Sequence, residues 1–173
     1  FSFKVEGQLN AVGNTNNLIE IKPFNESWKG ISFGTPSGEA DVNTSFLSYV
    51  NIDCGGYSSN NEAVVLGKHN INSINNLRIS NAATAIRVTG FASIDNIIDC
   101  EFEAITQGIV FQYCDLVTNV LIEDCIFNNI LDRAVEISQS QAFLENIFIS
   151  GCEFDNSALG SNLSGSAVYI TLN

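Results

Sequence analysis

The sequence contains no methionine and very few basic residues, prolines, histidines or tryptophans. Seven Lys and Arg stand against 19 Asp and Glu, which gives a net charge of −12 over 173 residues. A protein that neutralises a nucleic-acid backbone needs the opposite charge, and an anionic membrane surface repels such a chain. No run approaches about 18 consecutive apolar residues. We therefore expect neither a nucleic-acid partner nor membrane insertion.

Residues that form strands and turns are abundant instead. The chain has 22 Asn, 13 Gly and 20 Ile, and hydrophobic residues make up 45% of it. Asn and Gly favour turns and Ile favours strands, while this hydrophobicity excludes a disordered chain. We expect one all-β domain over residues 1–173. Because the chain opens at Phe1 without a leader and lacks a polar cap after Ile170, we also expect a fragment of a longer chain or an oligomer.

Two short patterns alternate along the chain. The first is a small residue, an aliphatic residue, any residue and a large apolar one. Its copies begin at Gly30, Ala63, Ala85, Gly108, Ala134 and Ala167, at intervals of 33, 22, 23, 26 and 33 residues. The second is an aliphatic strand that runs into Cys54, Cys100, Cys125 or Cys152, or into Asn81 in the place of Cys. Periods of 20 to 50 residues made only of strands and turns indicate the coils of a parallel β-helix.

The segment Trp28-Lys29-Gly30-Ile31-Ser32-Phe33 and the recurring Asn-x-x-Ile-x-x-Cys-x-Phe resemble bacterial right-handed parallel β-helix proteins of the pectin-lyase-like superfamily. The resemblance spans about Val5 to Ile170. It implies a right-handed parallel β-helix of about five to six rungs and an extracellular or cell-surface location. That superfamily includes lyases, hydrolases, phage tailspikes and adhesins, so the resemblance implies no single function.

Motifs for polysaccharide cleavage are missing. The polygalacturonase family carries Gly-His-Gly and Arg-x-Lys, whereas the single His69 follows Lys68 in a segment that we interpret as a turn. A lyase would need a basic residue and often Ca²⁺, for which Arg87 and Arg133 are the candidates. Arg87 is expected to face outward with no carboxylate beside it, as a structural residue. Its expected ladder neighbours are Ser32, Val65, Val110, Glu136 and Tyr169.

Apolar side chains at outward positions of this ladder give the binding candidates. Val65, Val110 and Tyr169 mark either a surface for a partner or one that a loop covers. The insertions at 35–44 and 156–166 favour a covering loop. Trp28 is a candidate for stacking on a sugar ring, although a lone Trp before a strand is more typical of a packing anchor.

Acidic residues gather in the C-terminal half, where 12 of them follow Phe91 against one basic residue, Arg133. Asp99 and Glu101 are expected to face outward from one strand, with Asp124 one rung later. Stacked carboxylates repel each other, and Ca²⁺ would relieve that repulsion. We favour a solvated acidic face without a cofactor and keep Ca²⁺ at these three residues as the alternative.

Four of the five cysteines are expected to share one place in the repeat. Cys54, Cys100, Cys125 and Cys152 would then form an inward ladder of buried, unreactive thiols. A disulfide between Cys100 and Cys125 is the alternative.

Three functions stay open. We favour a non-catalytic secreted or cell-surface domain for adhesion or glycan contact. The alternatives are a polysaccharide lyase or glycoside hydrolase, and a structural segment of a fibre or phage tail. The expected partner is a polysaccharide or another protein surface.

Overall fold

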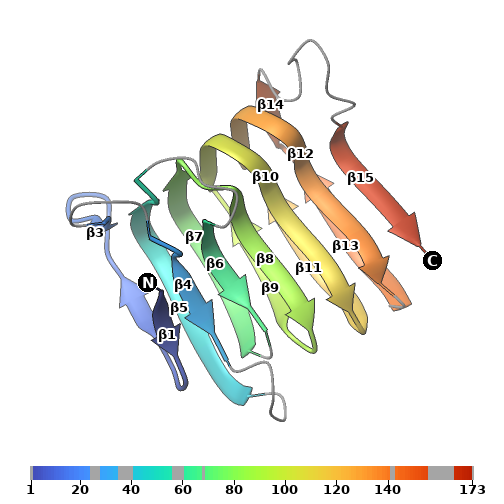
Figure 1. Cartoon of the computed structure of the whole chain (residues 1–173), viewed down its shortest axis with the longest axis horizontal. Helices are drawn as coiled ribbons and strands as arrows, with labels where there is room; N and C mark the ends of the chain where they lie inside the picture. The colour runs from blue at the N-terminus through green and yellow to red at the C-terminus, as the bar shows by residue number, and fades with distance from the viewer. Residues whose placement is uncertain are drawn as a thin grey trace.

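The chain is an all-β solenoid. The computed structural model describes residues 2–23, 28–34, 41–55, 61–67, 69–140, 143–155 and 166–172. Within these ranges 15 strands pair in parallel to form one continuous sheet, and no helix occurs. The sheet winds into about five turns (Figure 1). This confirms the predicted parallel β-helix, and no described segment forms an apolar helix long enough to cross a membrane.

Each coil contributes a strand to three faces. Face A consists of β1 (Phe3–Val5), β4 (Ile31–Phe33), β6 (Glu62–Leu66), β8 (Thr84–Gly90), the second halves of β10 (Glu101–Cys114) and β12 (Ile126–Ser140), and β15 (Ser166–Leu172). Face B consists of β2 (Asn10–Val12), the first halves of β5 (Asp41–Asp53) and β7 (His69–Ser80), β9 (Ser93–Ile98), β11 (Leu116–Glu123) and β13 (Phe143–Ser150). Face C consists of β3 (Ile19–Ile21), the remaining halves of β5, β7, β10 and β12, and β14 (Glu153–Asp155).

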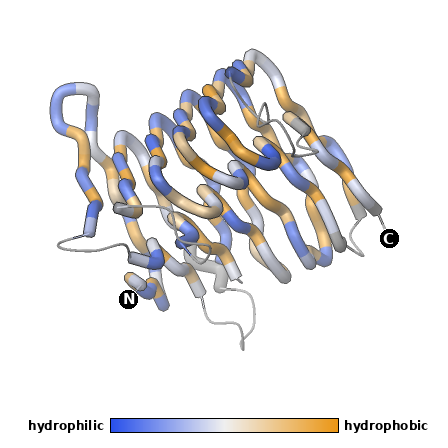
Figure 2. The backbone as a smooth tube through the Cα atoms, turned by 45° about the horizontal axis from the view of Figure 1, so that its top comes forward, coloured by the Kyte–Doolittle hydropathy of each residue, from blue (hydrophilic) through white to orange (hydrophobic). Residues whose placement is uncertain are grey.

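The core is a set of inward-facing ladders. Because side chains alternate between the two faces of a strand, every second residue points inward, and hydrophobic and hydrophilic residues alternate along the chain (Figure 2). Aliphatic side chains fill most of the interior. On face C the rings of Phe102 and Phe127 stack at 4.9 Å, and those of Phe127 and Phe154 at 5.1 Å.

The corner between faces B and C is made by residues with positive φ. Tyr49, Asn76, Asp99 and Asp124 have φ between 52° and 55°, and Gly151 has φ of 64°. The ladders on either side place these five residues at equivalent positions in successive coils. Asn, Asp and Gly tolerate this left-handed conformation, which explains part of the Asn-rich composition.

The cysteine prediction is wrong in register. Cys100, Cys125 and Cys152 lie at equivalent positions, but Cys54 lies four positions later in its coil, opposite Asn81. The cause is that Val50–Asp53 belongs to face C, whereas Ile97 and Ile98 belong to face B. Both segments have the same period-two pattern, so the pattern cannot tell one face from the other.

The inward placement of the thiols is confirmed for most of them. Cys54, Cys100 and Cys125 are buried, as is Cys114, and Cys152 is half-buried. All five cysteines are free thiols in the structure. Burial raises the pKa of Cys54 and of Cys114 to about 12, so both stay protonated at neutral pH.

Two further expectations need correction. His69 is not a turn residue but the first residue of β7, fully buried, with its Nε2 2.7 Å from the hydroxyl of Ser45 and its ring stacked on Phe33. Asp99 does not share a strand with Glu101, because it lies in the corner between β9 and β10. Lys68 and most of the two predicted covering loops lie outside the described residues.

Candidate functional site

Charged side chains gather in two places, on the outer surface of face A and at the corner between faces B and C. On face A the register confirms the predicted outward ladder around Arg87. The ladder runs through Lys4, Ser32, Val65, Arg87, Val110, Glu136 and Tyr169.

Arg87 has a carboxylate partner, which corrects the expectation that none lies beside it. Its Nε forms an ion pair with Glu62, its Nη1 donates to Gln112 Oε1 at 2.7 Å, and its Nη2 donates to Thr84 Oγ1 at 3.1 Å. Glu62 was missed because it precedes the ladder position by three residues and faces Thr84 in the register. With these partners the guanidinium is held in place on the sheet, as expected for a structural residue.

Glu136 is the centre of the second half of this network. Its side chain is only 4% exposed. Its carboxylate accepts hydrogen bonds from Gln107 Nε2 at 2.8 Å and Ser138 Oγ at 2.6 Å, and it forms an ion pair with Arg133 Nη1 at 2.7 Å. Buried carboxylates are tolerated only with such partners. The carboxylates of Glu136 and Asp132 raise the pKa of Arg133 and keep it charged, against the opposing effect of burial.

The remaining predicted binding residues pack against, or contact, other residues of the solenoid. The Cζ of Arg133 lies 4.0 Å from the centre of the Tyr169 ring, within the range of a cation–π contact. Val110 is fully buried although it points outward, and Val65 is half-buried. Trp28 is buried and its Nε1 donates to the carbonyl of Asp53 at 3.0 Å, which places it in the packing role.

A groove of about 400 Å³ follows the corner between faces B and C. We call it the corner groove. Its lining comes from five successive coils: the β2–β3 connection, β5, β7, the β9–β10 corner and the β11–β12 corner. At about 4.8 Å per coil the groove spans roughly 20 Å along the solenoid axis. Its lining includes Leu18, Tyr49, Asn76, Arg78, Asp99, Glu101 and Asp124.

The three predicted calcium ligands all lie along this groove. Asp99 and Asp124 are exposed, and Glu101 pairs with Arg78, whose Nε lies 3.0 Å from Glu101 Oε2. Within the described ranges no three His, Cys, Asp or Glu side chains come close enough together to hold a metal ion. The carboxylates therefore line one groove without forming a coordination shell for Ca²⁺.

Tyr49 is a residue of the groove that the sequence did not indicate. It is half-buried at the N-terminal part of the groove, where Leu18 is 43% exposed. An aromatic ring beside exposed polar groups suits the apolar face of a sugar. Tyr49 shares the corner position with Asn76 and Asp99, but only the ladders of the structure align these three residues, so the repeat pattern did not identify it.

Comparison of the chain with family models, curated proteins and solved structures gives no match. The geometry of the solenoid and of its two charged sites is therefore what indicates a function.

Proposed function

We propose that this chain is a non-catalytic β-solenoid domain that binds a glycan chain lengthwise in the corner groove. The observation that carries the proposal is the groove itself, which crosses five coils and is lined by exposed carboxylates, Arg78 and Tyr49. An extended polymer fits an axial groove, since each of the five coils contributes lining groups at a regular spacing.

The charges in the groove select the kind of glycan. Asp99, Glu101 and Asp124 contribute three negative charges, against one positive charge from Arg78. A uronate polymer would meet like charge, which disfavours its association. Neutral sugars, and sugars that carry free amino groups, can donate hydrogen bonds to these carboxylates. We therefore propose a neutral or amino-sugar glycan as the ligand.

The absence of cleavage is part of the proposal. On face A the two arginine candidates are held by the neighbours described above, so neither guanidinium is placed to take a proton from a substrate. We also keep membership of the pectin-lyase-like superfamily and a location at the cell surface as proposals. Both rest on the resemblance of the repeated strand pattern to that superfamily.

Binding and turnover can be tested on one set of oligosaccharides. Isothermal titration with cello-oligosaccharides, chito-oligosaccharides with and without N-acetyl groups, polygalacturonate and alginate would rank the classes. We expect binding of neutral or amino sugars and none of the uronates. Absorbance at 235 nm and reducing ends, followed with and without Ca²⁺, would detect elimination or hydrolysis.

A preference for uronates, or turnover that disappears in Arg87→Ala or Arg133→Ala, would contradict the proposal and favour the enzyme. The variant Asp99→Asn is the test within the groove, since Asn adopts the same backbone conformation at Asn76. We expect weaker binding of amino sugars and little change for neutral ones, because the Asn oxygen still accepts a hydrogen bond from a hydroxyl group but no longer offers a negative charge to an ammonium group.

A further inference from the structure

A second pocket lies on face B, near its corner with face A. Its volume is about 280 Å³, and it is lined by residues 91–95 and 116–120 together with Asn70 and Phe111. We call it the face B pocket. Among the described residues it shares no lining residue with the corner groove, so the two sites are separate.

The face B pocket lies where β9 and β11 do not pair. Residues 96–98 of β9 pair with residues 121–123 of β11, but no ladder joins 93–95 to 116–120. Both stretches are paired on their other sides, to β7 and to β13. The gap in the sheet is thus confined to one boundary between two interior coils.

A difference of one residue between the two coils explains this gap. Gly90 and Cys114 are ladder partners, as are Asn96 and Leu121. Leu121 follows Cys114 by seven residues, whereas Asn96 follows Gly90 by six. The longer stretch contains Asn119, whose φ of 55° places it in the left-handed region. An extra residue in this conformation is typical of a β-bulge, which interrupts the ladder locally.

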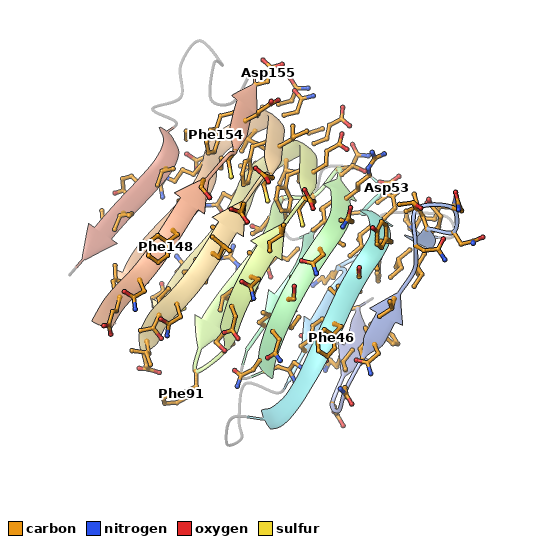
Figure 3. All side chains as sticks on the ribbon, turned by 180° about the vertical axis from the view of Figure 1, so that it is seen from behind. Phe46, Asp53, Phe91, Phe148, Phe154 and Asp155 are labelled. Carbon is orange, nitrogen blue, oxygen red and sulfur yellow. The ribbon has the colours of Figure 1, made fainter. Side chains whose placement is uncertain are left out.

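Apolar side chains form most of the inner wall of the pocket. The buried lining residues belong to the hydrophobic core: Ala92, Ile94, Phe111, Val117 and Val120. At the mouth, Phe91 and Leu116 are exposed. Phe91 lies at the turn between β8 and β9, where its side chain projects from the solenoid (Figure 3). The pocket therefore leads from an aromatic ring on the surface to the apolar interior.

Asp95 is the one charged side chain in the described lining of the pocket. Its carboxylate has no ion pair or hydrogen bond with a described residue, and burial raises the pKa of this carboxyl group. The polar neighbours, in contrast, are paired across the coils. Ser93 Oγ donates to Asn70 Oδ1 at 3.0 Å, and Asn119 Oδ1 accepts from the next coil at 3.0 Å. The carboxylate has thus lost part of its hydration without gaining a donor.

The size and charge of the pocket define the ligand that fits it. An apolar cavity of about 150 Å³ holds a benzene molecule, and drug-sized ligands occupy roughly 300 Å³ or more. A volume of about 280 Å³ therefore suits one ring or a short branched chain with a polar head. An ammonium head can donate to the Asp95 carboxylate and contact the face of the Phe91 ring.

We propose that the face B pocket binds a small organic amine, with its ammonium group on Asp95 and its apolar body against the inner wall. A ligand with a carboxylate head is disfavoured, because it would meet the charge of Asp95 and the net charge of −12 of the chain. This site does not depend on glycan binding in the corner groove.

Three probes with one body and different heads test the proposal. Phenethylamine carries an ammonium group, 2-phenylethanol a hydroxyl group and phenylacetate a carboxylate. Titration of the isotope-labelled chain, followed by amide chemical shifts in NMR spectra, reports both the affinity and the location of each probe. We expect the amine to bind about tenfold more tightly than the alcohol, and phenylacetate not to bind. The shifts should concentrate in residues 91–96 and 116–121.

The variant Asp95→Asn removes the charge and keeps the shape of the side chain. We expect it to weaken binding of phenethylamine about tenfold and to leave binding of 2-phenylethanol unchanged. Asp115→Asn is the matched control, since Asp115 is exposed, lies outside the lining and changes the net charge equally. Phe91→Ala should weaken binding of both probes, because both lose the ring at the mouth. Circular dichroism would verify that each variant is folded.

Several outcomes would overturn the proposal. Phenethylamine that does not bind at millimolar concentration, or that binds no better than phenylacetate, would show that the pocket does not select a cation. An equal loss in Asp95→Asn and Asp115→Asn would mean that only the overall charge attracts the amine. Loss of binding in Asp99→Asn, with shifts along the corner groove, would place the amine there and leave the face B pocket without a ligand.

Discussion

Face A and the corner groove are built from the same repeating coils, yet charged side chains are more buried on face A than in the groove. On face A the side chain of Glu136 is 4% exposed and has three partners, whereas in the groove the side chain of Arg78 is 64% exposed. The difference lies in how far the partners bury the charge. Glu136 accepts two hydrogen bonds besides its ion pair and is closed off from water, whereas the ion pair between Arg78 and Glu101 is exposed, so these charges stay accessible to a ligand.

The geometry of the two sites explains this division. On face A the parallel strands place side chains of adjacent coils side by side, where they hydrogen-bond to each other, as Gln107 does with Glu136. The groove follows a corner of positive-φ residues, where Asp99 and Asp124 are exposed. Side chains that diverge from a bend pair less easily with each other, and the groups remain in contact with water.

The largest expected effect is on face A. Glu136→Ala removes the carboxylate that accepts from Arg133, Gln107 and Ser138, so each of these three donors loses its contact with that carboxylate. We expect a loss of about 3 kcal/mol in the free energy of unfolding, measured by urea denaturation. The groove counterpart, Glu101→Ala, should cost less than about 1 kcal/mol, because its ion pair is exposed. Equal losses in the two variants would remove the distinction between the sites.

The free energy of unfolding at alkaline pH should depend on the two buried thiols of Cys54 and Cys114. The pKa of Cys54 and Cys114 is raised from 9.0 to about 12 by burial, so the folded state holds these protons more tightly than the unfolded chain. Their contribution to stability is complete below pH 9 and is lost as the pH rises toward 12. We expect each of the two thiols to lower the free energy of unfolding by about 2 kcal/mol between pH 9 and 11. A flat profile in that interval would contradict the burial of both thiols.

The reactivity of the thiols in the folded state should distinguish the half-buried Cys152 from the buried cysteines. Cys152 is half-buried, and a thiol reagent at pH 8 should modify it before any other cysteine. The Cys152→Ser variant should then show almost no rapid labelling. Fast modification of Cys54 would mean that the end of face C is more open than the structure shows.

The next effect concerns the corner itself. Gly151 has φ of 64°, and a Cβ at this position would lie 2.0 Å from Asp124 Oδ1. We expect Gly151→Ala to cost about 1–2 kcal/mol and to displace the Asp124 carboxylate along the groove. Gly7→Ala is the matched control, since a Cβ there meets nothing within 4 Å. Melting temperatures that fall equally in both variants would show that the corner is not under this constraint.

The smallest effect on stability is expected for Arg78→Gln. The exposed ion pair with Glu101 should contribute less than about 0.5 kcal/mol. The same substitution makes the groove more negative, so it should strengthen binding of an amino-sugar oligosaccharide relative to a neutral one. Titration calorimetry with both ligands measures the ratio, and an unchanged ratio would mean that Arg78 does not contact the ligand.

Much of the fold could be predicted from the sequence, because strand period and repeat length are local properties. The ladder of Arg87 was predicted residue by residue, since the small residue that opens each copy of the first pattern fixes its register. The cysteine ladder failed at Cys54 because strands of faces B and C share one pattern and only the corner residue between them differs.

The candidate site was only partly predictable. Asp99, Glu101 and Asp124 were identified by their acidity and do line one groove. Tyr49 and the pairing of Arg87 with Glu62 were not, because both depend on which side chains converge across coils. That convergence follows from the backbone corners and from rotamers, which a repeat pattern does not specify.

The most direct test of the account compares two tyrosines, one in each charged region. Tyr49→Asn removes the ring from the groove and keeps a residue suited to positive φ, while Tyr169→Leu removes the ring that contacts Arg133 on face A. Titration calorimetry would measure the affinity of both variants for the glycan class that the unmodified chain binds. We predict that Tyr49→Asn weakens binding about tenfold and that Tyr169→Leu leaves it unchanged; the reverse pattern would place the ligand on face A and contradict the account.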